Sequence, residues 1–120
     1  MTVPENEIHY LEIVTPDLEG ARDLYANAHG WSFGEKVPEL GNAYVASLPN
    51  GSRCGIRAPM HEQEAPTVRA YVRVADIDVA VAKAVELGAE LALGATEIPG
   101  QGHIAIFLLG GIQQGLWQVP

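Results

Sequence analysis

Arginine and aromatic side chains recur at alternate positions along short extended segments of this chain. Alternation places Arg69, Tyr71 and Arg73 on one face of one strand, and Arg53 with Arg57 on one face of another. Guanidinium groups bind carboxylates and phosphates through two parallel hydrogen bonds. These arginines therefore predict a surface that binds an anion, although arginines on one strand face are also compatible with a merely solvated surface.

A carboxylate lies on the first extended segment, where Tyr10 and Glu12 share a face. Matching the two halves of the chain pairs Tyr10 with Tyr71 and Glu12 with Arg73. In that arrangement Glu12 would serve as a general base and Arg73 would stabilise an oxyanion. The simpler interpretation is that Glu12 only holds Arg73 in place by an ion pair, and that the tyrosines form the wall of the site.

Composition limits the classes of protein that need consideration. The chain has 120 residues with Lys+Arg 7 and Asp+Glu 15, so its net charge of −8 disfavours a nucleic-acid-binding protein. One Cys excludes an internal disulfide and a multi-cysteine zinc site. The sequence has no run of 18 apolar residues that would span a membrane. We expect a single cytoplasmic domain over residues 1–120.

The elements that must position these side chains repeat once along the chain. Apolar residues at helical spacing predict helices from Asp17 to Gly30 and from Asp76 to Gly88. Alternating and glycine-punctuated segments predict the strands 8–14, 32–37, 44–48, 53–58, 68–74, 89–94, 103–109 and 115–119. Each half therefore contains a strand, a helix and three more strands, with module 1 at about 6–59, a linker at about 60–66 and module 2 at about 67–120.

This doubled βαβββ order resembles the vicinal oxygen chelate superfamily, which includes glyoxalase I, bleomycin-resistance proteins and extradiol dioxygenases. The resemblance rests on the segment from Tyr10 to Asp17, on Tyr71 to Val74 followed by Asp76, and on the closing run from Gly115 to Gln118. It implies an α+β fold in which two βαβββ modules form a curved, half-open cup of mixed sheet, with the helices on the outer face.

The resemblance also implies four positions at which metal-dependent members hold a divalent ion. Here the first of these positions offers Glu12 or His9, but Gly55 and Gly115 stand where the closing strands would supply glutamates. The remaining position offers only an arginine or a tyrosine. We therefore expect no metal cofactor, a divalent metal being the alternative, and we expect the two glycines to leave room in the cup.

In such a cup the arginines and aromatic residues would face one another. The predicted ligand-binding residues are Tyr10, Arg53, Arg57, Arg69, Tyr71, Gln113 and Trp117, and the candidate catalytic residues are Glu12 and Arg73. The favoured function is binding of a small, anionic, partly apolar molecule. The alternatives are a glyoxalase-type lyase or isomerase, a protein that binds cationic antibiotics, and a non-catalytic interaction module. The resemblance further implies a homodimer.

Overall fold

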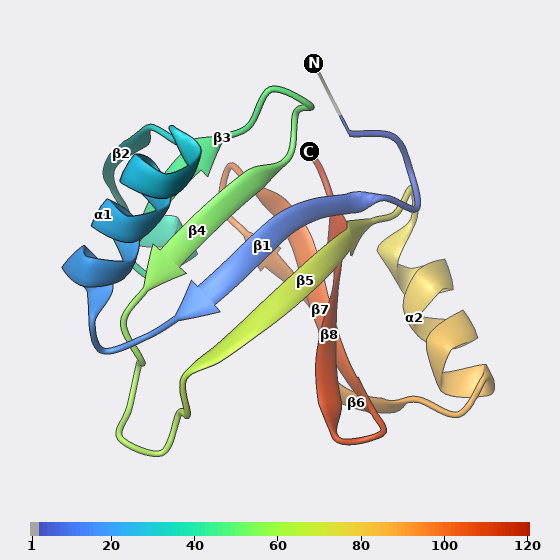
Figure 1. Cartoon of the computed structure of the whole chain (residues 1–120). Helices are drawn as coiled ribbons and strands as arrows, with labels where there is room; N and C mark the ends of the chain where they lie inside the picture. Colours follow the sequence, from blue (N-terminus) through green and yellow to red (C-terminus); the bar gives the residue numbers. More distant parts are fainter. Residues whose placement is uncertain (1–2) are drawn as a thin grey trace.

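A computed structural model describes residues 3–120 as two consecutive βαβββ modules that share one sheet (Figure 1). The first module comprises β1 (Ile8–Val14), α1 (Leu18–His29), β2 (Phe33–Val37), the 3-10 helix η1 (Pro38–Leu40), β3 (Ala43–Ser47) and β4 (Arg53–Arg57). The second comprises β5 (Thr67–Arg73), α2 (Ile77–Glu86), β6 (Glu90–Ile98), β7 (Gly102–Leu109) and β8 (Ile112–Gln118).

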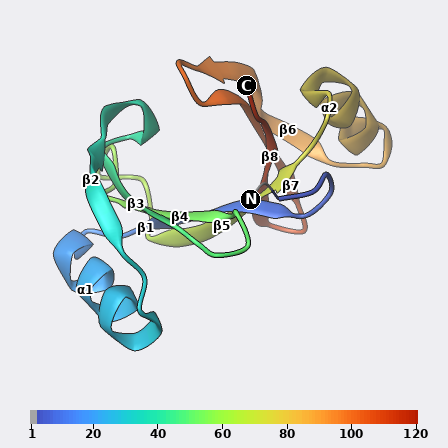
Figure 2. The ribbon, with the colours of Figure 1, turned by 90° about the horizontal axis from the view of Figure 1, so that it is seen from above.

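The strands form one mixed sheet in the order β2-β3-β4-β1-β5-β8-β7-β6. The modules meet at its centre, where β1 and β5 run antiparallel, and the first strand of each module pairs in parallel with the last. Seen from above, the sheet curves into an open cup, and both helices lie on its outer side (Figure 2). The predicted α+β fold is confirmed.

An aspartate side chain caps the N-terminus of each helix. The Asp17 carboxylate accepts a hydrogen bond from the Gly20 amide at 3.2 Å, and α1 ends at Gly30, whose positive φ suits a glycine. The Asp76 carboxylate caps α2 by accepting from the amides of Asp78 and Val79. Within residues 3–120, neither helix is long and apolar enough to cross a membrane.

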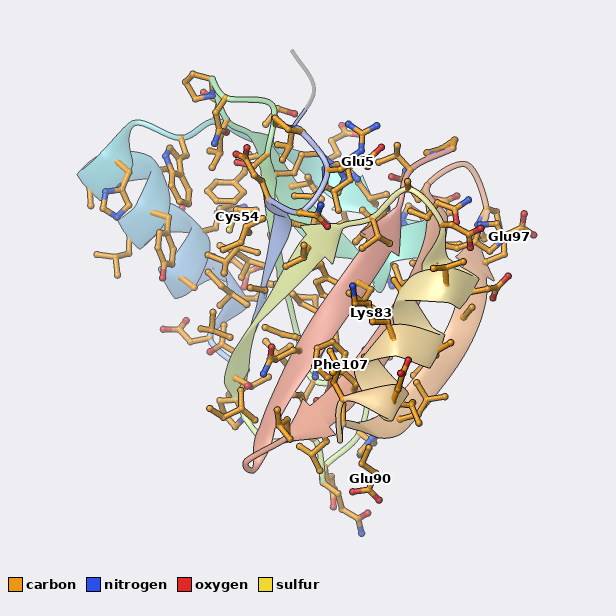
Figure 3. All side chains as sticks on the ribbon, turned by 90° about the vertical axis from the view of Figure 1, so that its right-hand side faces the viewer. Glu5, Cys54, Lys83, Glu90, Glu97 and Phe107 are labelled. Atoms are coloured by element: carbon orange, nitrogen blue, oxygen red, sulfur yellow. The ribbon has the colours of Figure 1, made fainter. Side chains whose placement is uncertain are left out.

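Each helix covers a separate apolar core on the outer face of the sheet. The buried residues of the core between α1 and the sheet are Ile13, Leu18, Cys54 and Ile56, of which Leu18 belongs to the helix. Those between α2 and the sheet are Val74, Ile77, Ala105 and Leu116, of which Ile77 belongs to the helix. Figure 3 shows Cys54 on the α1 side of the sheet and Phe107 on the α2 side. Burial raises the pKa of the Cys54 thiol to about 11, so the reactive thiolate form is rare at neutral pH.

The β7–β8 hairpin is longer than the sequence predicted, because β8 begins at Ile112 and not at Gly115. Gly110 and Gly111 have φ values of 62° and 78°, and Leu109 pairs directly with Ile112. Two consecutive positive φ angles are typical of a type I′ turn, which joins strands with only two residues. The hairpin therefore extends Gln113 and its neighbours as strand.

Strand β6 is likewise longer than predicted, because it continues to Ile98 and does not end at Gly94. Its pairing with β7 shifts register twice, once between Leu91 and Leu93 and once between Leu93 and Thr96. Such irregularities bend a strand without ending it. The extension adds Ile98 to the strand residues that line the cup.

Candidate functional site

The inner face of the curved sheet holds a cavity of about 270 Å³ that both modules line. Its walls come from η1, β6 and β7, and its floor comes from β1, β4, β5 and β8. The lining residues are Tyr10, Glu12, Glu39, Leu40, Gly41, Arg57, Met60, Glu64, Arg69, Tyr71, Leu93, Ile98, Ile104, Ile106 and Trp117. A cavity of this size suits a small organic molecule.

One wall of the cavity is apolar. Ile104 and Ile106 lie two residues apart on β7 and point to the same face, and Ile98 and Leu93 from β6 join them. Leu40 on η1 lies on the opposite side of the opening. Burying an apolar group among these side chains would stabilise a complex by about 25 cal/mol for each Å² removed from water.

Three aromatic side chains form the centre of the floor. Tyr10, Tyr71 and Trp117 are each at most 3% exposed, and the ring centroids of Tyr10 and Tyr71 lie 4.8 and 5.5 Å from that of Trp117. The indole Nε1 of Trp117 donates to the Gln101 carbonyl at 2.8 Å, which fixes the ring. Burial, and next the Glu12 carboxylate, raise the pKa of both tyrosines, so the phenols remain protonated.

The two glycines at the predicted metal positions leave no room, which corrects the sequence-based expectation. A Cβ on Gly55 would lie 2.5 Å from Cζ of Tyr10, and a Cβ on Gly115 would lie 2.5 Å from Cγ of Tyr71. Both distances are well inside van der Waals contact. Each glycine therefore allows a tyrosine ring to pack directly against the strand backbone.

Glu12 lies at the polar end of the floor and accepts three hydrogen bonds. Its carboxylate receives Nε of Arg57 at 2.8 Å, the Tyr71 hydroxyl at 3.0 Å and Nη1 of Arg69. Arg57 and Arg69 are 5% and 6% exposed, so Glu12 neutralises charge in a buried setting. A carboxylate has about four acceptor positions, and three are taken here. Glu12 therefore orients two guanidinium groups.

A second carboxylate, Glu64, reaches the same arginine from the linker between the modules. Nη1 and Nη2 of Arg57 donate to Oε1 and Oε2 of Glu64 at 2.9 and 2.7 Å, and the Met60 amide donates to Oε1 at 2.7 Å. The hydrogen bonds from Arg57 lower the pKa of Glu64 to about 2, and the same bonds raise the pKa of Arg57. The contact is a bidentate arginine–carboxylate pair.

The cavity is therefore not basic, contrary to the expectation from the arginine face. Arg57 and Arg69 bring two positive charges, whereas Glu12, Glu39 and Glu64 bring three negative charges to the same lining. Glu39 is exposed at the rim, and no ion pair joins it to any residue in the described part of the chain. An incoming anion must compete with these carboxylates for the guanidinium groups.

Arg73 does not pair with Glu12, and this prediction was wrong. In the antiparallel β1–β5 pair Glu12 is opposite Arg69, while Arg73 donates to the Val3 carbonyl beyond the far end of the pair. Four residues of strand separate Arg69 from Arg73, or about 13 Å. The correct partner shares the predicted face, because alternation fixes the face of a side chain and not its position along the strand.

Arg53 shares the inner face but does not line the cavity. Its guanidinium carbon lies 5.6 Å from the ring centroids of Tyr10 and Trp117, on the side of these rings where β4 begins. His9 lies nearby with both ring nitrogens buried and without a hydrogen-bond partner within residues 3–120. Burial, and then the charges of Arg53 and Arg73, lower its pKa to about 4.

Gln113 contacts the cavity network indirectly, through Arg69. Its Oε1 accepts from Nη2 of Arg69, whose Nη1 binds Glu12. Nε of Arg69 is buried and has no hydrogen-bond partner among the described residues. The structure thus brings together Tyr10, Glu12, Arg57, Arg69, Tyr71 and Trp117 in the cavity, with Gln113 behind it.

The side chains at this site do not fit a divalent metal ion. Gly55 and Gly115 provide no ligand atom, tyrosine rings fill the space beside them, and the carboxylate of Glu12 already binds two arginines. Over residues 3–120, no group of three or more His, Cys, Asp or Glu side chains is arranged to hold a metal ion.

Several lining residues were not predicted. Ile104 and Ile106 belong to the continuous apolar run 104–109, in which no alternation of apolar and polar residues marks the inner face. Glu39 and Leu40 belong to a 3-10 turn, and Met60 and Glu64 belong to the linker. These irregular segments have no periodic pattern that would place their side chains.

The sequence is similar to that of two curated proteins. No family model matches the sequence. The chain is 28% identical over 116 residues to "Putative glyoxylase CFP32" of Mycobacterium tuberculosis (strain CDC 1551 / Oshkosh), and equally to its namesake from Mycobacterium bovis. These matches include 92% of this chain but only 44% of each relative, so the chain spans less than half their length.

Solved structures show the same architecture at low sequence identity. The methylmalonyl-CoA epimerase of Mycobacterium tuberculosis superposes with a TM-score of 0.77 at 18% identity, over 100% of this chain and 93% of that one. A Streptomyces coelicolor methylmalonyl-CoA epimerase in complex with 2-nitronate-propionyl-CoA gives 0.67 at 16% identity, over 97% and 99%. With its paired βαβββ modules the chain shares the fold of these epimerases, and its sequence is similar to that of a curated relative named as a glyoxylase.

Proposed function

We propose that this protein binds a small, partly apolar molecule carrying one anionic group, and that it does so in the cup without a metal ion. The observation that carries the proposal is the bidentate face of Arg57, which holds the Glu64 carboxylate at the edge of an apolar, aromatic-lined cavity. A ligand carboxylate requires the same two parallel N–H donors. Its apolar part would lie against Ile104 and Ile106.

Preorganisation of Arg57 supports a binding site. The Nε edge of its guanidinium is held by Glu12 on the central strand β1, which leaves the Nη1/Nη2 edge directed toward the linker. The side chain is 5% exposed, so little conformational entropy is lost when a ligand binds there. One strand residue therefore orients the group that would recognise the ligand.

The arrangement favours binding over catalysis, because Glu12 is poorly placed to take a proton. Its carboxylate already accepts from Arg57, Arg69 and Tyr71. Only one acceptor position remains for a substrate proton, and protonation would remove the negative charge that pairs with two buried guanidinium groups. The structure thus supports the interpretation of Glu12 as an anchor for arginines, with Arg57 and Arg69 in place of Arg73.

An enzymatic alternative draws on the curated relatives, which are named as glyoxylases. In that alternative Glu12 is the base of a metal-free lyase or isomerase. Turnover of methylglyoxal–thiol adducts by the purified protein, abolished by Glu12→Gln, would favour the enzyme. Absence of turnover with and without added nickel, zinc, manganese or iron would favour binding, and about one retained metal ion per chain would contradict the metal-free site.

The binding proposal is tested with matched acids and amides. Calorimetric titration of the protein with benzoate and hexanoate, each against benzamide and hexanamide, should show tighter binding of the carboxylates. Arg57→Lys keeps the charge but loses the planar fork, so we expect it to weaken carboxylate binding about tenfold. Arg22→Lys, a change at a half-buried residue of α1 outside the cavity lining, is the control and should leave the affinity unchanged. Carboxylate affinities no tighter than about millimolar, or equal affinities for acids and amides, would refute the proposal.

We also propose a homodimer formed through the outer face of β1, β5 and β8. Ile8, Val68 and Ile112 are 54%, 59% and 63% exposed there, beside a groove of about 410 Å³. A second copy would bury these side chains, and an exposed apolar patch of this kind is typical of interaction sites. Sedimentation velocity should give a dimer that Val68→Lys converts to a monomer; a monomeric wild type would overturn the proposal.

A further inference from the structure

The linker residue Glu64 binds in the cup as a ligand would, although it belongs to neither module's sheet. Its two oxygens accept from the two Nη atoms of Arg57, and its Oε1 also accepts from the Met60 amide. Its side chain is 18% exposed, against 6% for that of Arg57. The carboxylate therefore lies at the boundary between the buried network and solvent.

The two carboxylates on Arg57 differ in how firmly the fold holds them. Glu12 lies in the middle of β1 between β4 and β5 and also binds Arg69 and Tyr71. Glu64 lies on an irregular segment, and within residues 3–120 its acid group bonds only Arg57 and the nearby Met60 amide. Releasing Glu64 would leave the β1 network intact.

A second cavity lies behind Glu64. It has a volume of about 530 Å³ and is bordered by the linker, by Thr67 and Arg69 of β5, and by the β7–β8 hairpin. Figure 1 shows the linker and this hairpin projecting beyond the same end of the sheet. Glu64 and Arg69 line both this cavity and the cup. The wall between the two spaces therefore contains Glu64 and the buried Nε of Arg69, which has no hydrogen-bond partner within residues 3–120.

We propose that Glu64 is a resident carboxylate that holds the ligand's place on Arg57, and that the linker releases it when a monocarboxylate with an apolar tail binds. This inference rests on the proposed binding function and names its ligand class and its control. The ligand carboxylate takes over both hydrogen bonds from the Nη atoms, the tail enters the cup, and release of Glu64 joins the cup to the second cavity.

Exchange of one carboxylate for another explains why the site selects monocarboxylate ligands. Before and after exchange, Arg57 has the same charge partner and the same number of hydrogen bonds, so no buried charge is left unpaired. A neutral amide cannot replace Glu64 on these terms, and a cation would be repelled by the guanidinium group. The affinity gained then comes from burial of the apolar tail.

Removal of the competing carboxylate should therefore strengthen ligand binding. A charge-assisted bidentate pair favours the closed linker by about ten- to a hundredfold, and the apparent affinity is reduced by the same factor. Glu64→Gln should raise the affinity for benzoate and hexanoate by about tenfold or more. It should raise the affinity for benzamide and hexanamide by less than about twofold, because the amides do not compete with the Glu64 carboxylate for the Nη atoms of Arg57.

Glu39→Gln is the matched control. Glu39 lines the same cavity and carries the same charge, but it binds no arginine within the described residues. Its neutralisation should increase carboxylate affinity only through long-range attraction, by about twofold at physiological salt. The gain in carboxylate affinity of Glu64→Gln beyond that of Glu39→Gln measures the competition for Arg57 separately from the change in net charge.

A structural readout in the wild-type protein accompanies the titrations. The Met60 amide donates to Glu64 Oε1 at 2.7 Å, so saturating benzoate should remove this acceptor. Its proton resonance should move upfield and its hydrogen exchange should accelerate, whereas benzamide should change neither. Unchanged Met60 exchange on saturation with benzoate would contradict displacement of the linker.

The outcomes separate the two proposals. If wild type and Glu64→Gln both fail to bind either acid, the proposed function is wrong and this inference with it. If wild type binds the acids but Glu64→Gln gains no more than Glu39→Gln, the function stands and the resident carboxylate is refuted. If wild type binds the acids and Glu64→Gln binds them about tenfold more tightly than Glu39→Gln does, the exchange is supported.

Discussion

Replacement of Gly115 by alanine tests how the aromatic floor is built. The added methyl group would lie 2.5 Å from Cγ of Tyr71, although carbon atoms in contact prefer about 3.5–4.0 Å. Tyr71 cannot easily retreat, because its ring packs edge-on against Trp117 at 5.5 Å and its hydroxyl donates to Glu12 at 3.0 Å. The overlap of about 1 Å at Cγ, which is larger still at Cδ2 of Tyr71, must be relieved by moving a ring that both of these partners hold.

The magnitude follows from two opposed effects. Gly115 has no positive φ, so the unfolded-state effect of alanine would by itself stabilise the fold by about 0.4–1 kcal/mol. Overpacking of a buried ring costs about 1–3 kcal/mol. We therefore expect Gly115→Ala to lower the free energy of unfolding by about 1–2 kcal/mol. For a domain of this size the melting temperature should fall by about 4–8 °C.

Urea denaturation followed by tryptophan fluorescence measures this change, and Gly34→Ala provides the control. Gly34 lies on the edge strand β2, where an added Cβ would meet no atom closer than 3.9 Å, so its replacement should be neutral or slightly stabilising. In a Tyr71→Leu background the cost of Gly115→Ala should shrink by about 1 kcal/mol or more. Equal costs in both backgrounds, or a Gly115→Ala variant as stable as Gly34→Ala, would refute the interlocked packing.

Two further predictions concern buried titratable groups. Because the pKa of His9 is lowered to about 4 in the folded protein, the unfolded chain takes up this proton first as the pH falls from 6.5. The free energy of unfolding should therefore drop by up to about 3 kcal/mol between pH 6.5 and 4. In urea denaturation at several pH values, His9→Phe should lose most of this pH dependence. An unchanged pH dependence would count against the burial of a neutral imidazole. Cys54 is 0% exposed with a pKa of about 11, so a thiol reagent at pH 8 should label the native protein on the order of a hundredfold more slowly than the protein in urea; rapid native labelling would contradict its burial.

The sequence predicted the regular part of this fold because each signal was local. Asp17 and Gly30, and Asp76 with Gly88, carried the backbone requirements of helix ends, and these requirements do not depend on tertiary context. Alternation placed Tyr10, Glu12, Arg69 and Tyr71 on the inner face of the sheet. Local signals therefore sufficed for the elements and for the face of each strand.

Position along the strands was harder to predict, because a register error of two residues keeps every side chain on its face. Matching Tyr10 with Tyr71 as equivalent residues of the two modules led to Glu12 with Arg73. In the sheet Glu12 pairs with Gly55 and Tyr71 pairs with Gly115, so Glu12 and Tyr71 are the equivalent pair. The packing of the Tyr10 ring over Gly55 could not be predicted either, because no sequence pattern indicates which side chain fills the space beside a glycine.

The predicted charge of the site had the wrong sign for a different physical reason. Counting cations on strand faces found Arg57 and Arg69, but their counter-charges come from the middle of β1 and from an irregular linker. Burying two guanidinium groups at 5% and 6% exposure without partners would cost several kcal/mol for each ion, so any fold that buries them must also supply carboxylates. Two buried arginines therefore require a carboxylate such as that of Glu64, but the sequence does not indicate which segment supplies it. A site whose anion partner comes from a loop is one whose arginine can exchange that partner for a ligand.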